Sequence, residues 1–357
     1  MSADEFQVIR DLFAPAARDP GARGLMDDAA LIGAQGPLVV TTDALVEGVH
    51  FLPDDPIATV AMKAMRANVS DLVGKGAAPA AALLTLIWPN DRPAEDIAIF
   101  AEAIRGELES FGMTLLGGDT TSTEGPLTIS ITAFGAPLGD RVPARSEALA
   151  GDDVWLVGGE IGSAWLGLQV RTGAIKPEEI TQGRDEEAAR AEAEMLAPNM
   201  PDYLLIDGKF DPEMAWLMSC YLAPFVRVEC ADVVSQVARA SMDVSDGLVA
   251  DAAKMAAASG VAIKIDANAI PFAVPAARWV MSGGDFRKLI TGGDDYVVLF
   301  TAPPEAREAL ERAETEARLG LTRIGVVEPG EGVSVVDRNG VAVPLPESGG
   351  YTHKLGK

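Results

Sequence analysis

The sequence predicts an α/β or α+β protein of two domains, and three observations carry that prediction. Apolar segments of strand length alternate with amphipathic segments of helix length along the whole 357-residue chain. A loop rich in Gly, Pro and Arg, residues 137–153, separates two such halves. The length allows each half its own hydrophobic core. We therefore expect an N-terminal domain over residues 1–140 and a C-terminal domain over residues 150–357.

In the first half, residues that start or stop regular structure delimit the expected elements. An apolar strand over residues 37–42 is expected to end at Asp43. A helix over residues 56–73 begins with a proline in its first turn and is closed by Gly74. The other expected elements are a strand at 80–88, a helix at 93–111, a short strand at 113–116 that leads into Gly117 and Gly118, and a strand at 127–136.

The second half repeats this alternation with shorter segments. The expected elements are helices at 183–196 and 246–258 and strands at 153–157, 240–244, 261–265, 297–301, 323–327 and 333–336. The helix at 183–196 is rich in Ala and Glu, which is typical of a helix exposed to solvent. Residues 197–233 show no clear period, and we assign no element to them.

Composition excludes several classes of protein. The formal net charge of −24 repels nucleic acid, so we expect no nucleic-acid partner. No apolar run reaches the length of a membrane span, and the N-terminus lacks the pattern of a signal peptide, so we expect no membrane association and a cytoplasmic location. Neither cysteine sits in a C-x-x-C arrangement and two histidines are too few for a histidine-rich metal site, so we expect a metal here to be held by oxygen ligands.

Aspartates recur at the expected strand ends and in glycine-rich turns. A single aspartate in such a place is more often a turn or cap residue than a ligand. Their repetition favours carboxylates that converge at one edge of the fold and hold Mg²⁺, which would also screen a triphosphate from an acidic protein. The chemistry indicated is phosphoryl transfer. The aspartates concerned are Asp27, Asp28, Asp43, Asp71, Asp119, Asp243, Asp246, Asp294 and Asp295.

The nucleotide-binding motifs of the common kinase classes are absent from the sequence. There is no P-loop, no kinase-type glycine-rich loop and no Rossmann fingerprint. Glycine pairs at 117–118, 158–159 and 292–293 are weak signals, because tight turns explain most such pairs. Lys63 and Arg145 are the basic candidates for phosphate contacts, with an exposed surface charge as the competing interpretation.

Taken in order, these motifs resemble the thiamine-monophosphate kinase family, within the superfamily that includes aminoimidazole ribonucleotide synthetase. The most specific string is Thr41-Thr42-Asp43-Ala44-Leu45-Val46-Glu47-Gly48-Val49-His50-Phe51. Further matching segments are 27–31, 63–64, 68–72, 76–79, 117–121, 145–146, 243–248 and 292–296. The resemblance extends from residue 6 to about residue 353, which is nearly the whole chain.

The resemblance implies a fold, a reaction and a set of site residues. It implies an N-terminal domain that binds ATP and Mg²⁺ and whose strands form a barrel across a homodimer, and direct in-line transfer from ATP to thiamine monophosphate. Asp43, Asp119 and Asp246 would be the residues on which catalysis depends. The implied Mg²⁺ ligands are Asp28, Thr41, Thr42, Asp43, Asp71, Asp119, Asp243 and Asp246; the nucleotide contacts are Gly118, Asp119, Arg145 and Ser245; the substrate contacts are His50, Asp294, Ser348 and Tyr351.

Two departures from the family pattern and two alternatives bear on this interpretation. Met26 stands where the family usually has Gly, and Ser348 stands where it often has an aromatic residue. One alternative is another ATP-dependent enzyme of the superfamily with a different small acceptor. Selenophosphate synthetase would need a reactive cysteine near the N-terminus, and the first cysteine here is Cys220. The other alternative is a catalytically silent nucleotide-binding protein.

Overall fold

The chain folds into two compact units. The computed structural model describes residues 8–25, 30–31, 33, 36–196, 200–346 and 349–351. Unit 1 takes residues up to 142 together with residues 228–236, and unit 2 takes residues 143–227 and the remainder from 237. Each unit combines a main sheet with helices, which confirms the predicted two-domain α/β or α+β class.

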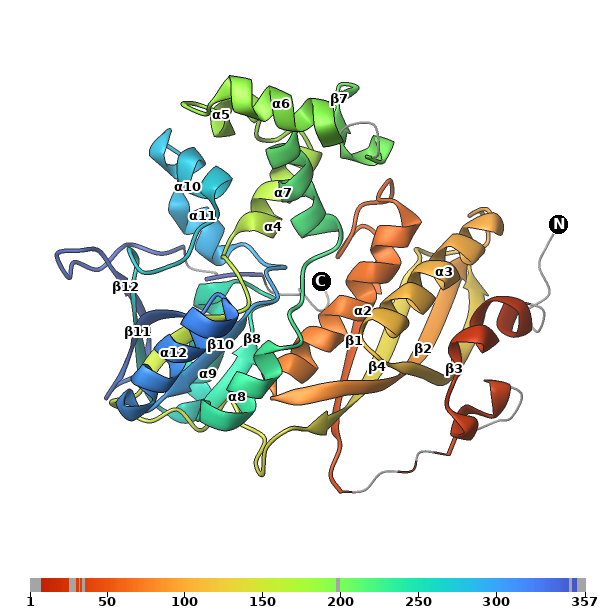
Figure 1. The fold of residues 1–357 in the computed structure, drawn as a ribbon, viewed down its shortest axis with the longest axis horizontal. Coiled ribbons are helices and arrows are strands. Elements are labelled where there is room, and N and C mark those ends of the chain that lie inside the picture. Colours follow the sequence, from red (N-terminus) through yellow and green to blue (C-terminus); the bar gives the residue numbers. More distant parts are fainter. Residues whose placement is uncertain are drawn as a thin grey trace. The chain divides into compact units, whose positions relative to one another are not determined.

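Unit 1 is built on a four-stranded sheet with the order β1-β4-β2-β3 (Figure 1). The strands are β1 (Val39–Val46), β2 (Ala77–Pro89), β3 (Thr114–Thr123) and β4 (Thr128–Pro137). Helices α2 (Ile57–Gly74) and α3 (Glu95–Ser110) pack against each other, and α2 lies along β1, β4 and β2. Three short turns of helix precede the sheet: η1 (Ile9–Phe13), η2 (Ala14–Ala16) and η3 (Pro20–Leu25).

The two faces of this sheet differ in burial. On the face that meets the helices, Leu84, Leu86 and Ile131 are buried, and Trp88 meets Phe100 of α3 edge to face, with 6.4 Å between the ring centroids. On the other face, alternate residues such as Thr85 and Thr132 stay half-exposed. Alternation of side chains along each strand produces this division, because successive residues point to opposite faces. The sheet of a single chain remains open, with β1 and β3 as its edge strands.

Both edge strands extend further than the sequence predicted. The strand expected to end at Asp43 continues to Val46, and the strand expected to end at residue 116 continues to Thr123. The glycines and polar residues of both motifs therefore lie inside strands, and the prediction that Asp43 and Asp119 follow strands is wrong. Such residues are poor formers of central strands, but an edge strand tolerates them because one side of its backbone is free.

Unit 2 contains a six-stranded sheet with the order β12-β9-β11-β5-β10-β8 (Figure 1). All neighbouring pairs are antiparallel except β12 and β9. The strands are β5 (Asp153–Val157), β8 (Ala240–Asp243), β9 (Ala262–Asp266), β10 (Val298–Ala302), β11 (Thr322–Glu328) and β12 (Gly332–Val336). Helix α9 (Leu248–Ser259) contacts β8, β9 and β12 and closes a core that includes Leu156, Ile263 and Leu299.

Unit 2 contains further helices, several of which lie outside the predicted elements. They are α4 (Ser163–Arg171), α5 (Pro177–Ile180), α6 (Glu186–Leu196), α7 (Pro212–Leu222), α10 (Val274–Met281), α11 (Phe286–Thr291), η6 (Pro304–Ala306) and α12 (Arg307–Ala317); α8 (Cys230–Val237) lies mostly with unit 1. The exposed character predicted for α6 is confirmed, since none of its residues is buried.

The segment at residues 197–233, for which the sequence predicts no element, is partly regular in its described part, residues 200–233. It holds η5 (Asp202–Leu204), the short hairpin of β6 (Leu205–Ile206) and β7 (Lys209–Phe210), helix α7 and the start of α8. Helix α7 has apolar residues on several sides of its axis, so its sequence shows no helical period. None of the helices in the described part of the chain combines the length and apolar character that a membrane span needs.

Candidate active site

One group of candidate residues lies where β1 meets α2, which we call the β1–α2 seam (Thr41, Asp43, Asn68 and Asp71). The Thr41 hydroxyl donates a hydrogen bond to an Asp71 carboxylate oxygen. The Asp43 backbone N–H donates to Asn68 Oδ1 at 3.1 Å, and buried Asn68 is itself anchored by its own amide to the Ala64 carbonyl at 3.0 Å. The strand and the helix thus bring two carboxylates and a hydroxyl to one seam, all of them hard oxygen donors.

The predicted substrate contact His50 sits in a tight turn after β1. The imidazole Nδ1 accepts the Val46 N–H at 3.0 Å, which assigns the proton of the neutral ring to Nε2. The ammonium group of Lys63 donates to the His50 carbonyl at 3.1 Å. Lys63 is only 2% exposed, so its interpretation as a surface charge is wrong. The turn is thus held by a buried cation from α2, and the N–H of the neutral His50 ring is at Nε2.

Sheet register separates Asp43 from Asp119 within one chain. Asp43 pairs with Ile131, Ile131 with Leu84, and Leu84 with Gly118, so Asp119 lies one residue beyond the row of Asp43. Three strand spacings of about 4.8 Å put the two strands roughly 14 Å apart. Because adjacent residues point to opposite faces, Asp43 and Asp119 also lie on opposite faces of the sheet. Within a single chain the two do not converge, contrary to expectation.

Gly118 is required by the packing of the sheet. A Cβ added at this position would lie 1.8 Å from the Leu84 carbonyl oxygen of the neighbouring strand, and the backbone φ is 157°. No other residue avoids that overlap without moving the backbone of β2. The glycine is therefore explained by the sheet itself, whether or not it also lets a ligand approach the backbone.

In unit 2, two loops far apart in sequence lie side by side and gather several candidates. The Asp294 N–H donates to the Ser245 carbonyl at 2.9 Å, and the Tyr351 N–H donates to the Asp246 carbonyl at 3.1 Å. Asp294 and Tyr296 both have positive φ, 68° and 52°, and the Tyr296 hydroxyl donates to Asp294 Oδ1 at 3.1 Å. Backbone strain of this kind is typical of functional sites.

Asp246 belongs to a charge cluster that sequence reasoning missed. The Lys254 ammonium donates to Asp246 and to Asp251, the latter at 2.7 Å. Burial lowers the pKa of Lys254, but hydrogen bonds to both carboxylates outweigh it and raise that pKa. Fully buried Asp251 accepts the Ser245 and Asp246 N–H groups at 3.0 Å each, and burial raises its pKa. The three-residue spacing of Asp251 and Lys254 puts both side chains on one face of α9, and this spacing is the sequence pattern that indicates an ion pair.

The remaining candidates are more scattered. Exposed Arg145 has its carbonyl bonded to the Ser259 hydroxyl at 2.9 Å, which puts its backbone at the end of α9 opposite Ser245. Asp243 is buried as the last residue of β8. Thr42 points away from the β1–α2 seam and bonds to the Ile131 carbonyl at 3.1 Å. Asp28 and Ser348 lie outside the described residues. Across the described ranges, no three His, Cys, Asp or Glu side chains come close enough to hold a metal by themselves.

Comparison with known proteins decides the family. The family model "AIR synthase related protein, N-terminal domain" matches residues 26–136, and its C-terminal counterpart matches residues 209–338. Thiamine-monophosphate kinase of Caulobacter vibrioides is 34% identical over 92% of this chain and 86% of its own length. The chain belongs to the thiamine-monophosphate kinase family. Members of this family are kinases, and so the chain is a phosphotransferase.

Solved structures of this family agree with the fold. Thiamine-monophosphate kinase from Stenotrophomonas maltophilia is 32% identical, with 89% of this chain and 90% of that chain covered and a TM-score of 0.69. The structure of AaThiL complexed with AMPPCP and TMP is 30% identical, with 89% of each chain covered and a TM-score of 0.68. The resemblance that the sequence motifs carried is thereby confirmed.

Proposed function

We propose that this chain phosphorylates thiamine monophosphate to thiamine diphosphate at the expense of ATP. The observation that carries the proposal is the relative complexed with AMPPCP and TMP, an ATP analogue together with the second ligand, on the same fold at 30% identity. The β1–α2 seam of unit 1 supplies oxygen donors, and in unit 2 the loops around Ser245 and Asp294 supply carboxylates and backbone groups, which are the groups that bind phosphates and their metal ions. A cytoplasmic location remains part of the proposal, since ATP is its co-substrate.

Direct in-line transfer between the two phosphates is the mechanism we propose. Neither cysteine suits a covalent step: Cys230 is buried, and burial, with Asp295 and Glu160 nearby, raises the pKa of Cys220 to about 12. Catalysis then depends on positioning and on neutralising charge. In this proposal His50 offers its Nε2–H, and Asp294 and Tyr351 contact the acceptor substrate, while Gly118, Asp119, Arg145 and Ser245 contact the nucleotide.

Mg²⁺ fits the donor set of the β1–α2 seam. Two carboxylates and a threonine hydroxyl are hard ligands, and Mg²⁺ commonly needs only one or two carboxylates because phosphates and water complete its shell. When bound, the ion would neutralise charge on the phosphates. Thr41, Asp43 and Asp71 are the residues of the seam that would hold it. The further ligands in this proposal are Asp28, Thr42, Asp119, Asp243 and Asp246.

We propose that the N-terminal domain expected over residues 1–140, which makes up most of unit 1, is also the dimerisation domain. In the described part of the chain, the outer side of each edge strand has no neighbouring strand and one face of the sheet is half-exposed; Val40 on that face of β1 is 55% exposed. Two such sheets closed into a barrel would cover the face and pair the edges. In such a barrel, β1 of one chain would lie beside an edge strand of its partner. Asp43 of one chain and Asp119 of the other would then contribute to the same site.

Product analysis tests the proposed function. The purified protein is given ATP and Mg²⁺ with either thiamine monophosphate or free thiamine, and products are separated by chromatography. We expect thiamine diphosphate from the monophosphate alone, and only with Mg²⁺. Measurable ATP binding without this product would mean that the chain acts on another acceptor or is catalytically silent.

Lys63→Met is expected to weaken use of thiamine monophosphate specifically. The substitution keeps the length of the side chain but removes the ammonium group that holds the His50 carbonyl at 3.1 Å. Loss of a hydrogen bond from a charged donor predicts a KM for thiamine monophosphate raised by about tenfold. The KM for ATP and kcat should stay within about threefold of wild type. Lys75→Met, at the C-terminal end of the same helix, is the control. An equal change in both KM values would contradict this role.

A further inference from the structure

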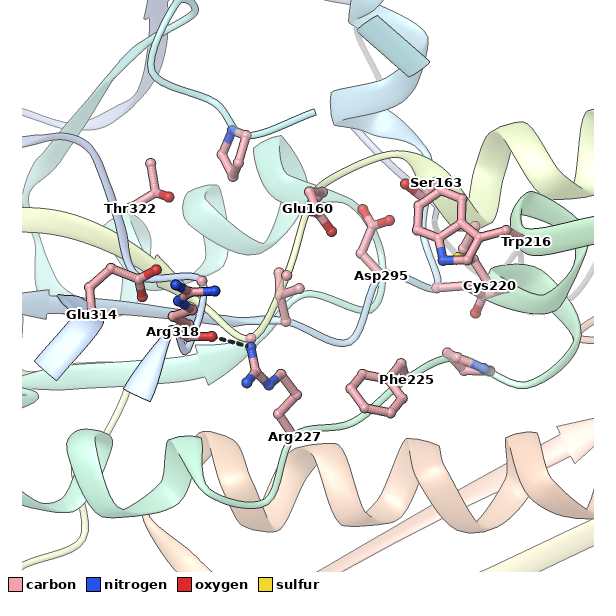
Figure 2. A pocket seen from close by; sticks show the side chains of 18 residues that line it. Glu160, Ser163, Trp216, Cys220, Phe225, Arg227, Asp295, Glu314, Arg318 and Thr322 are labelled. Carbon is pink, nitrogen blue, oxygen red and sulfur yellow. Dashed lines mark hydrogen bonds between the residues drawn. The ribbon is translucent and has the colours of Figure 1, made fainter. Parts of the chain in front are cut away.

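The loop after β8, residues 244–247, contacts two other parts of unit 2. The first is a turn whose Asp294 N–H donates to the Ser245 carbonyl at 2.9 Å and which lines a cavity of about 490 Å³ (Figure 2). The second is helix α9, which meets the loop through a carboxylate and an ammonium group. Because the loop carries Ser245 and Asp246, the contacts that fix its shape also place these two candidate residues.

The backbone of this loop is fixed by contacts that do not involve Lys254. Buried Asp251 accepts the Ser245 and Asp246 N–H groups at 3.0 Å each. Close packing adds to this, because a Cβ at Gly293 would lie 2.4 Å from the Ser245 carbonyl oxygen. The path of the main chain is therefore set by Asp251 and by the neighbouring turn.

The Asp246 side chain, by contrast, depends on Lys254. Its Oδ2 accepts a hydrogen bond from the Lys254 ammonium, and no other group among the described residues donates to this carboxylate. Lys254 is held in turn by Asp251, which accepts from the same ammonium at 2.7 Å. The Asp246 side chain is 33% exposed, so its carboxylate, unlike that of Asp251, is accessible from solvent.

The charges of this cluster suit an aspartate that binds a cation. Asp251 balances the charge of Lys254, since its carboxylate lies 2.7 Å from the ammonium, and Asp246 keeps its own negative charge for a ligand. Without the lysine, the two carboxylates would repel each other, and the exposed Asp246 would turn away from the buried Asp251. A group that hydrogen-bonds to a ligating carboxylate in this way commonly fixes its orientation.

We propose that Lys254, itself held by Asp251, is a positioning residue that orients the Asp246 carboxylate toward the Mg²⁺ that accompanies the nucleotide. The inference rests on the proposed function, in which Asp246 is one of the metal ligands. Lys254 acts through Asp246 and touches neither phosphate nor metal. Its removal should therefore weaken the response to Mg²⁺ without weakening the binding of nucleotide in the absence of the ion.

Calorimetric titration of AMPPCP into the full-length protein, without Mg²⁺ and at a series of Mg²⁺ concentrations, tests this role without requiring turnover. Lys254→Met keeps the length of the side chain but removes its charge. Half of its Mg²⁺-dependent gain in affinity should need about tenfold more Mg²⁺ than in wild type, while its affinity without Mg²⁺ should stay within about threefold. Lys254→Arg restores a cationic donor and should need no more than about threefold more Mg²⁺.

Lys264→Met is the matched control. Lys264 of β9 is similarly exposed and pairs with Glu328 of β11 at 3.0 Å, so this variant should respond to Mg²⁺ as wild type does. Thermal melting checks that each variant is folded. Lys254→Gln keeps a neutral donor for Asp251 and provides the same test should Lys254→Met fail to fold.

The other outcomes overturn the proposal in different ways. A Lys254→Met protein that needs less Mg²⁺ would show that Lys254 competes with the ion, and an unchanged requirement would show that it has no such role. Equal weakening with and without Mg²⁺ would assign Lys254 to direct phosphate binding. The expected shift in Lys254→Met together with a wild type that forms no thiamine diphosphate would refute the proposed function and leave this role standing.

Discussion

Replacing Asp43 by alanine is expected to lower kcat for thiamine diphosphate formation by on the order of 10³-fold while leaving the fold intact. Asp43 lies on the half-buried side of an edge strand, and its backbone N–H, which remains in the variant, makes the bond to Asn68. The substitution therefore removes the carboxylate without disturbing the β1–α2 seam. Steady-state assays at saturating ATP and Mg²⁺ give kcat, and circular dichroism reports the fold. Asp91→Ala, an exposed turn residue of the same unit, should be unaffected.

Mixed dimers extend this test to the separation of Asp43 from Asp119. Asp119→Ala should be as inactive as Asp43→Ala if both residues serve the same reaction. If each site combines Asp43 of one chain with Asp119 of the partner, a mixed dimer keeps one intact site, and random exchange restores about one quarter of wild-type activity. If the mixture of the two variants stays inactive, Asp43 and Asp119 of the same chain must serve the same site. That result would contradict the separation that the sheet register predicts. Near-normal activity of either single variant would show that the replaced aspartate is not a metal ligand.

The sequence predicted the fold class well because apolar periodicity reports burial directly. Strands such as β5 and β10, buried on both faces, read as continuous apolar runs. The edge strands were shortened because the Thr-, Gly- and Asp-rich motifs do not look like strands, although an edge position accepts them. Helix α7 lies in a stretch whose sequence shows no clear period, although Asp211 caps its first turn by accepting the Glu213 and Met214 N–H groups at 3.1 Å.

Candidate residues could be identified from motifs, but their neighbours could not. The strings around Ser245 and Asp294 were recognised separately, and only the fold brings the two loops together through backbone hydrogen bonds. The spacing of Asp251 and Lys254 shows that these two side chains can pair, but nothing in the sequence of the helix shows that Lys254 also reaches Asp246 in the preceding loop. Asp295 belongs to a recognised motif, yet its hydrogen bond from the Gly162 N–H at the start of α4 depends on a contact between segments remote in sequence. Contacts between segments remote in sequence are thus the part that pattern reasoning does not reach.

Asp153→Asn is expected to destabilise unit 2 by about 2–3 kcal/mol. Asp153 is 1% exposed at the start of β5 and accepts hydrogen bonds at 2.7 Å from Arg307 of α12 and from Arg323 of β11, so one carboxylate ties three elements together. Breaking a fully buried ion pair costs about 3–5 kcal/mol, but these arginines are nearly half-exposed and solvent screens them, which reduces the expected loss. Urea denaturation followed by circular dichroism measures it. Glu328→Gln, which breaks an exposed pair with Lys264, should cost less than about 1 kcal/mol.

The same carboxylate predicts how stability changes with pH. Burial raises the pKa of Asp153, but its hydrogen bonds to Arg307 and Arg323 outweigh burial and hold that pKa below its ordinary value. A lowered folded-state pKa stabilises the protein above the pKa of the unfolded chain, about 3.9, and that stabilisation is lost as pH falls through the folded-state value. The free-energy gap between wild type and Asp153→Asn should thus be constant from about pH 5 to 8 and shrink below about pH 4. A gap that widened on acidification would mean that the arginines do not stabilise the ionised carboxylate.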